Sequence, residues 1–101
     1  MGSERLTVAL VGYGYWGPNL LRNYMELPGA TVKWVCDRDP GKLAKAKMRY
    51  PAVTVTEDYR DVLGDPEVDA VLIATPISTH FKLALAAIET GKHVFVEKPM
   101  T

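Results

Sequence analysis

The chain has 101 residues, 48% of them hydrophobic, and its 12 basic side chains balance its 12 acidic ones. This length predicts one domain with its own core, and the neutral balance argues against nucleic acid as a partner. The single cysteine, Cys36, excludes an internal disulfide and a multi-cysteine metal site, and it fits a reducing compartment. Because no signal segment and no membrane-spanning run is found, we expect a cytoplasmic protein without membrane contact.

Short apolar runs alternate with helical patterns along the chain. Strands are predicted over 6–11, 31–36, 53–55, 68–74 and 93–96. Helices are predicted over 18–27, from Asp39-Pro40 to Tyr50, from an N-cap at Thr56 to Leu63, and from Ser78 or Thr79 to Ile88 with Gly91 as the C′ residue. Five β units joined by helices predict an α/β fold. We expect a doubly wound, Rossmann-type parallel sheet of order 3-2-1-4-5 with helices on both faces.

The first strand runs directly into "GYGYWG", a G-x-G-x-x-G motif that opens a helix. Gly12 allows a tight turn, Gly14 lets a diphosphate approach the backbone, and Gly17 lets the helix pack close to the sheet. The helix N-terminus offers free N–H groups to phosphate. Tyr15 and Trp16 need to present only their backbone there, so their rings are free to point toward substrate. The motif predicts dinucleotide binding, and the alternative is a glycine turn used only for packing.

Asp37 closes the second strand about twenty residues after the glycine motif, where the ribose-binding acid of a dinucleotide site belongs. A carboxylate there can accept both ribose hydroxyls and repels a 2′-phosphate, which favours NAD over NADP. Arg38 would favour NADP if it bound a 2′-phosphate. Its alternatives are stacking on adenine and solvation. The basic cluster Lys42/Lys45/Lys47/Arg49 is interpreted as a solvated helix face.

Two further stretches complete the pattern: "ATPISTH" after the fourth strand and "HVFVEKPMT" at the end. With "GYGYWG" and "CDRDP" they make the sequence resemble the glucose–fructose oxidoreductase/inositol dehydrogenase/MocA (Gfo/Idh/MocA) family over 6–101. The resemblance implies NAD(P)-dependent oxidation of a hydroxyl on a sugar, nucleotide sugar or cyclitol. Ile77 stands where many members have Asn, so an amide contact there is either missing or made by backbone.

The resemblance also implies residue roles. It places the diphosphate at Gly12, Tyr15 and Trp16, and the adenosine ribose at Asp37. It places the nicotinamide half along Thr75, Pro76 and His80, and the nicotinamide ribose and substrate between Glu97 and Lys98. Lys98 would assist proton movement, and the Lys98–Pro99 peptide would be cis. His80 has an open alternative as a helix-capping or surface residue.

Family members are much longer and carry a second domain that holds the sugar. The resemblance therefore implies that residues 1–101 are the dinucleotide-binding domain, without the substrate domain and inactive alone. Two alternatives stay open. One is a stand-alone nucleotide-binding or self-assembling module. The other is an adenosylmethionine-dependent methyltransferase, against which the glycine spacing and Glu97-Lys98-Pro99 both argue. The apolar "VFV" of the fifth strand, expected at a sheet edge, predicts self-association.

Overall fold

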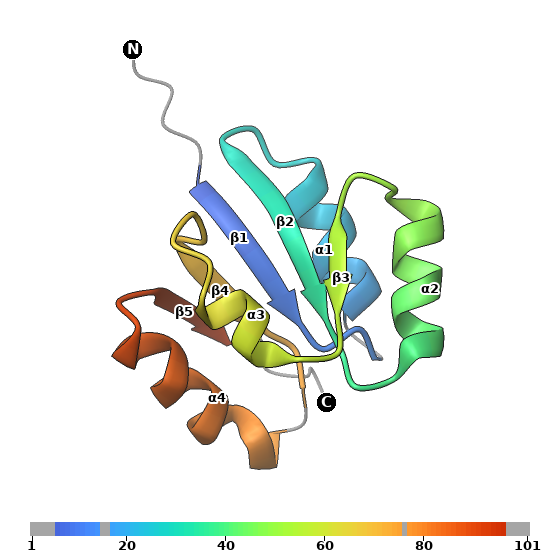
Figure 1. Cartoon of the computed structure of the whole chain (residues 1–101). Coiled ribbons are helices and arrows are strands. Elements are labelled where there is room, and N and C mark those ends of the chain that lie inside the picture. The colour runs from blue at the N-terminus through green and yellow to red at the C-terminus, as the bar shows by residue number, and fades with distance from the viewer. Residues whose placement is uncertain (1–5, 15–16, 76, 97–101) are drawn as a thin grey trace.

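The structure, a computed structural model, describes residues 6–14, 17–75 and 77–96, and for 77–80 it describes the backbone alone. The elements follow in the order β1 (Leu6–Val11), α1 (Gly17–Met25), β2 (Ala30–Cys36), α2 (Pro40–Arg49), β3 (Thr54–Thr56), α3 (Tyr59–Leu63), β4 (Ala70–Ile73), α4 (Ile77–Glu89) and β5 (His93–Val96). The strands form one parallel sheet of order β3-β2-β1-β4-β5 (Figure 1). The predicted Rossmann-type fold and strand order are confirmed.

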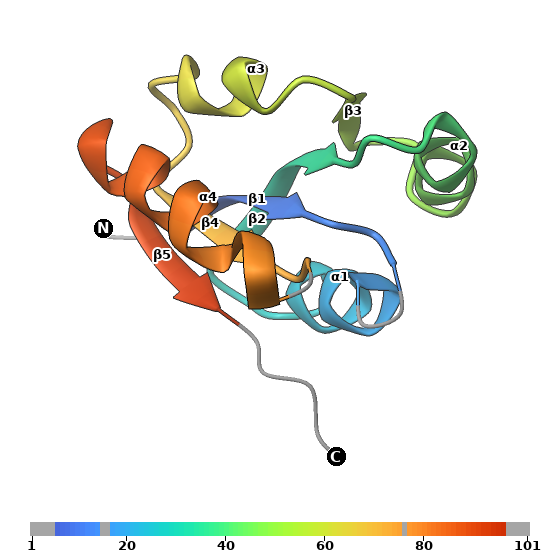
Figure 2. The ribbon, with the colours of Figure 1, turned by 90° about the horizontal axis from the view of Figure 1, so that it is seen from below.

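Helices cover both faces of the sheet, and Figure 2 shows α1 on one side and α3 on the other. One apolar cluster joins the sheet to α1 and α2 through Leu21, Leu43 and Ala46. A second cluster joins the opposite face to α3 and α4 through Val62 and Ala87. The central strand β1 is buried from both sides, which is why its sequence is apolar at successive positions instead of alternating. No helix in the described part of the chain is long and apolar enough to cross a membrane.

Helix ends follow local capping chemistry. The Asp39 side chain accepts a hydrogen bond from the Gly41 N–H at 2.9 Å and caps α2, with Pro40 in the first turn as predicted. At the end of α4, Gly91 adopts φ +84°, and its N–H donates to the Ile88 carbonyl while the next N–H donates to that of Ala87. This is a Schellman motif, so Gly91 holds the predicted C′ position.

Five local expectations need correction. Asp58, not Thr56, caps α3, because the helix begins at Tyr59 and only the Asp58 carboxylate reaches the Arg60 N–H. Helix α1 ends at Met25, before the predicted limit at position 27. The third strand lies one residue later, β4 is shorter, and α4 is slightly longer than expected.

The apolar stripe of α4 also differs from a core-facing pattern. Phe81, Leu85 and Ile88 are exposed, Phe81 by 77%, while Ala87 and the half-buried Leu83 and Ala84 make the contact with the sheet. Their i, i+4, i+7 spacing is typical of a helix, but the three side chains lie on the face that points away from the core.

A bulge in β2 changes which residues share a face. Val8 of β1 pairs with Val32, but the next residue, Ala9, pairs with Trp34, so Lys33 is the extra residue. Lys33 and Trp34 consequently point toward the same face, and both reach the carboxylate of Asp65 in the turn before β4. The Lys33 Nζ lies 2.7 Å from Asp65 Oδ2, and the Trp34 Nε1–H donates to the same oxygen at 2.8 Å.

Asp65 joins three parts of the chain. Besides β2, its Oδ1 accepts from the Glu67 N–H, and its main-chain carbonyl accepts from the Nζ of Lys92, a buried lysine just before β5. The hydrogen bonds from Lys33 and then Trp34 lower the pKa of Asp65 from 3.8 to about 2, and its side chain is only 10% exposed. The ionised carboxylate thus links β2 to the turn before β4.

The lowered pKa of Asp65 predicts an acid-sensitive contribution to stability. Because the folded value lies below the unfolded one, this stabilisation is complete above about pH 4 and is lost as the pH falls toward 2. Allowing for solvent screening, it contributes roughly 1 kcal/mol. Urea unfolding of Asp65→Asn should show a lower free energy of unfolding at pH 7 and a shallower loss between pH 5 and 3 than wild type. Asp69→Asn, at an exposed carboxylate without an ion pair in the described part, is the control; an unchanged acid slope in Asp65→Asn would refute the assignment.

Candidate functional site

The loop after β1 lies between the ends of its two neighbouring strands. The Gly12 N–H donates to the Cys36 carbonyl at the end of β2, and the Ala74 N–H donates to the Val11 carbonyl, both at 2.8 Å. Helices leave β1 and β4 on opposite faces of the sheet, so this is the point at which the winding reverses. In open parallel sheets, ligands bind in the crevice at such a point.

Two of the three motif glycines are required by close contact. Gly12 has φ +100°, and a Cβ there would lie 2.8 Å from the Thr75 methyl carbon. A Cβ on Gly17 would lie 2.5 Å from the Gly12 carbonyl oxygen, so any side chain would push α1 away from the loop. Gly14 differs, because the nearest atom to its missing Cβ is the Lys42 Nζ at 3.7 Å. No described residue packs closely against this position, so packing does not require a glycine here. The missing side chain leaves that side of the loop open to a ligand.

Asp37, directly after β2, is held against this loop. Its Oδ2 accepts the Tyr13 N–H at 2.7 Å, and its Oδ1 accepts the Asp39 N–H at 2.8 Å. A carboxylate offers about four lone-pair sites, so each oxygen keeps one for another donor. The half-buried carboxylate is thus oriented and still able to accept two hydroxyl groups, which is the geometry that a ribose diol needs.

The other predicted site residues fall into two groups. Arg38 is exposed beside Asp37, and the half-buried Thr75 lies at the end of β4 with its methyl group against Gly12. His80 is within α4, but its side chain lies outside the described part. Tyr15, Trp16, Pro76, Glu97, Lys98 and the predicted cis Lys98–Pro99 peptide also lie outside the described residues. The structure therefore brings Gly12, Gly14, Gly17, Asp37 and Thr75 together.

Lys42 is exposed, as the sequence pattern predicts for a solvated helix face, and it also lies close to this group. It lies in the first turn of α2, and its ammonium approaches the glycine loop. The available signal is its position five residues after Asp37, just inside the helix that Asp39 caps. Lys45 and Arg49 on the same helix are exposed as expected, and the Lys47 Nζ donates to the Val53 carbonyl.

The thiol of Cys36 does not contribute to this chemistry. It is buried, and burial, followed by the nearby charge of Asp37, raises its pKa to about 11. The thiol therefore stays protonated at neutral pH, as a small core residue should. No group of side chains suited to hold a metal ion occurs among residues 6–14, 17–75 and 77–96.

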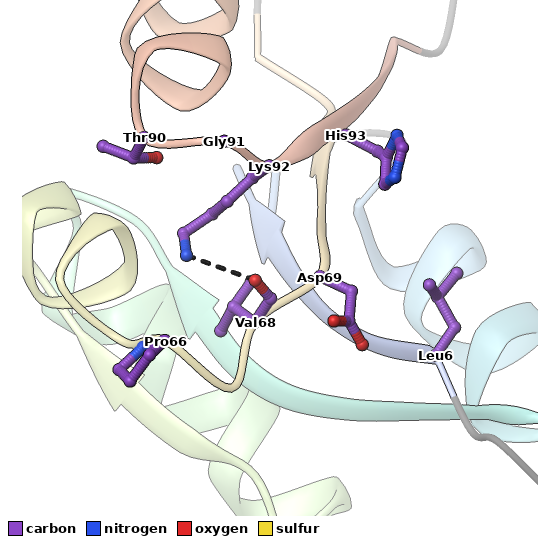
Figure 3. A pocket seen from close by; sticks show the side chains of 8 residues that line it. All are labelled: Leu6, Pro66, Val68, Asp69, Thr90, Gly91, Lys92 and His93. Atoms are coloured by element: carbon purple, nitrogen blue, oxygen red, sulfur yellow. Dashed lines mark hydrogen bonds between the residues drawn. The ribbon is translucent and has the colours of Figure 1, made fainter.

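A cavity of about 580 Å³ lies at the opposite, amino-terminal end of the strands (Figure 3). Its lining includes Leu6, Asp69, Lys92 and His93. The Lys92 Nζ donates to the carbonyls of Asp65 and Val68, so its charge serves the turn before β4 and is not presented to the cavity. This cavity is separate from the glycine loop and offers no comparable arrangement of ligand-binding groups.

Comparison with known proteins agrees with the geometry. A model of the family described as "Oxidoreductase family, NAD-binding Rossmann fold" (GFO_IDH_MocA) matches residues 6–101. The curated inositol 2-dehydrogenase of Rhodococcus jostii (strain RHA1) is 41% identical over 101 residues, which cover 99% of this chain and 28% of that protein.

Solved structures share the fold and include complexes with both nicotinamide cofactors. Levoglucosan dehydrogenase in complex with NADH and L-sorbose matches with a TM-score of 0.84 and 33% identity, over 94% of this chain and 27% of its own. Biliverdin reductase of Synechocystis sp. PCC 6803, in complex with biliverdin and NADP+, matches with a TM-score of 0.85 and 29% identity, over 93% and 29%. This chain thus spans less than a third of each of these proteins. Because the family model matches residues 6–101, and because the glycine loop and the oriented Asp37 agree with it, the chain belongs to the Gfo/Idh/MocA oxidoreductase family, and residues 6–101 form the NAD-binding Rossmann domain of that family.

Proposed function

We propose that this domain serves an NAD-dependent dehydrogenase that oxidises a hydroxyl group of a sugar, nucleotide sugar or cyclitol. The observation that carries the proposal is the Asp37 carboxylate, oriented by the Tyr13 N–H and still able to accept two ribose hydroxyls. The substrate class is supported by the relatives, which include an inositol dehydrogenase and a levoglucosan dehydrogenase. The family assignment favours this interpretation over an adenosylmethionine-dependent methyltransferase.

The described residues would bind the adenosine diphosphate half of the cofactor. The diphosphate would lie over Gly14, near the N-terminus of α1, where free N–H groups and the helix dipole favour its charge. The adenosine ribose would be bound by Asp37. When bound, the nicotinamide ring accepts the hydride, and the protein's part is to hold it in place. We place Thr75, two residues after the end of β4, along the way to that ring.

The nicotinamide side rests on the family resemblance. We propose Pro76 and His80 along the ring, and Glu97 and Lys98 beside its ribose and the substrate, with Lys98 assisting removal of the hydroxyl proton. A lysine near a cofactor cation and away from bulk water can exchange protons at neutral pH, because both influences disfavour its charged form. The cytoplasmic location expected from the sequence stays a prediction.

Cofactor preference follows from the charge of Asp37. We expect calorimetry to show tighter binding of NAD than of NADP, since the carboxylate repels a 2′-phosphate. Asp37→Asn removes the charge and one acceptor, so NAD should weaken and NADP should strengthen, changing their ratio by about tenfold or more. The matched control is Asp69→Asn, which removes the charge of a carboxylate that accepts the Thr7 N–H at the other end of the sheet. Equal or tighter binding of NADP by wild type would mean that Arg38 dominates the site.

We further propose that the 101-residue chain binds dinucleotide without oxidising a sugar. Hydride transfer needs a base, typically contributing about 10²–10⁴-fold, and a substrate carbon held over the nicotinamide. The described site residues would contact the cofactor and not the sugar, and the relatives are more than three times as long. Absorbance of reduced nicotinamide should therefore stay at background over a panel of sugars and nucleotide sugars. Turnover that disappears in Lys98→Ala would contradict this and make the domain an enzyme in its own right.

Self-association through the β5 side of the molecule is a second proposal. Within the described part β5 pairs only with β4, so its outer N–H and C=O groups have no strand partner, and Phe95 and Val96 are about half exposed. The exposed α4 stripe of Phe81, Leu85 and Ile88 adds an apolar helix face. The occupant we propose is a second copy of the chain.

Charge on α4 fits a twofold arrangement. If two α4 helices pack antiparallel about an axis near Leu85, the exposed Lys82 of one copy lies opposite Glu89 of the other, twice per pair. Light scattering should show a dimer whose dissociation constant rises in Lys82→Glu and recovers when Glu89→Lys is added. A wild-type chain that stays monomeric over a wide concentration range would contradict the proposal.

A further inference from the structure

The glycine loop carries one side chain that is buried in the core. In the described part of this loop Tyr13 stands between Gly12 and Gly14. Its side chain is only 7% exposed and belongs to the apolar cluster that joins the sheet to α1 and α2. Because glycine loses more conformational freedom on folding than any other residue, a loop with two glycines needs an anchor to keep one conformation. The buried ring of Tyr13 supplies that anchor.

The Tyr13 ring lies between α1 and α2. Its Cδ1 is 3.5 Å from the position that a Cβ of Gly17 would take, so the ring is within van der Waals range of the start of α1. Burial and then Tyr50 raise the pKa of the phenol, while Arg49 lowers it. Both residues are at the C-terminal end of α2, so the phenol approaches that end of the helix. The ring thus ties the loop to both helices that cover this face of the sheet.

The main chain of the same residue orients the Asp37 carboxylate. The Tyr13 N–H donates to Asp37 Oδ2 at 2.7 Å, and the Asp39 N–H donates to Oδ1 at 2.8 Å. The Asp39 contact is local to the turn after β2, whereas the Tyr13 contact fixes the carboxylate relative to the glycine loop. Since the N–H and the ring belong to one residue, burial of the ring restricts the direction in which the N–H points.

We infer that Tyr13 is a positioning residue, whose buried ring holds its N–H against Asp37 and thereby sets the carboxylate for the ribose diol. This inference rests on the proposed function and deepens it. Hydrogen bonds weaken steeply as their angle departs from linear, so a carboxylate that accepts two ribose hydroxyls must keep one orientation. Removal of the ring therefore weakens recognition of the ribose hydroxyls, although the ring itself is not the group that accepts them.

The test measures recognition of the ribose 2′-hydroxyl. Titration calorimetry gives the Kd of 2′-deoxyadenosine diphosphate divided by that of adenosine diphosphate. This ratio should be about ten in wild type, because the deoxy compound loses a hydrogen bond to a carboxylate. Tyr13→Ala should lower the ratio to about two, whereas Tyr13→Phe keeps the ring and should retain it. Tyr13→Leu fills more of the core than alanine and should give an intermediate ratio, which decides the question if Tyr13→Ala does not fold.

The matched control for lost core packing is Val53→Ala. Val53 is fully buried in the same cluster and precedes β3, at the other end of the sheet from the loop. Val53→Ala should lower the melting temperature and leave the ratio unchanged. A double-mutant cycle gives a second readout, because Tyr13→Ala should have no effect on the ratio once Asp37→Ala has removed the carboxylate.

Three results would overturn the inference and leave the proposed function intact. They are a ratio that Tyr13→Ala does not change, even with a uniform loss of affinity, a ratio that falls equally in Tyr13→Phe, and one that falls equally in Val53→Ala. Equal binding of the two nucleotides by a wild-type chain that binds NAD would also overturn it, since Asp37 would not then serve the ribose. A wild-type chain that binds no NAD would refute the proposed function itself.

Discussion

The contact between the start of α1 and the carbonyl of Gly12 determines how the rest of the domain is arranged. Since a Cβ on Gly17 would lie 2.5 Å from that oxygen, only glycine lets the helix begin directly against the end of the central strand. Gly12 adopts φ +100° to make this turn, and Thr75 closes on it from the end of β4. The loop is thereby confined between β2 and β4, where backbone N–H groups can face a phosphate.

Charged side chains fasten the two ends of the sheet in different ways. At the carboxyl end, Asp37 accepts two backbone N–H groups and keeps acceptor sites for a ligand. At the other end, Asp65 accepts from Lys33, Trp34 and the Glu67 N–H, all of them groups of the chain itself, which is a structural role. The cavity near that end is lined by a buried lysine that donates to two main-chain carbonyls. The chemistry of the two ends thus assigns ligand binding to one and stability to the other.

Exposed large apolar side chains gather on the α4–β5 side of the described structure. An edge strand with exposed apolar side chains and a helix with an exposed apolar stripe lie next to each other there (Figure 1). Soluble domains usually shield such an edge, because its free N–H and C=O groups can pair with another strand. This exposure and the opposed charges at the ends of the α4 stripe both favour a protein partner over open solvent at this surface.

The sequence by itself determined the alternation of strands and helices, the sheet order, the glycine turn and the acid after β2. These features depend on local signals, namely runs of apolar residues, capping residues and the spacing of Gly12, Gly17 and Asp37. Gly12, Gly17, Asp37 and Thr75 lie close together after the ends of β1, β2 and β4, and their roles in binding stay predictions. Several others, such as Lys98, lie outside the described residues, so their roles rest on the resemblance alone.

Only the tertiary structure decided the features that depend on a partner distant in sequence. The bulge at Lys33 depends on the register between β1 and β2, and it brings two neighbouring side chains to one carboxylate about thirty residues away. The outward direction of the α4 stripe depends on which helix face meets the sheet. The approach of the Lys42 ammonium to Gly14 depends on how α2 lies against the glycine loop, so the sequence could not distinguish Lys42 from the other exposed lysines of its helix. Local patterns specify elements, whereas contacts between elements specify which side chains are left to bind a ligand.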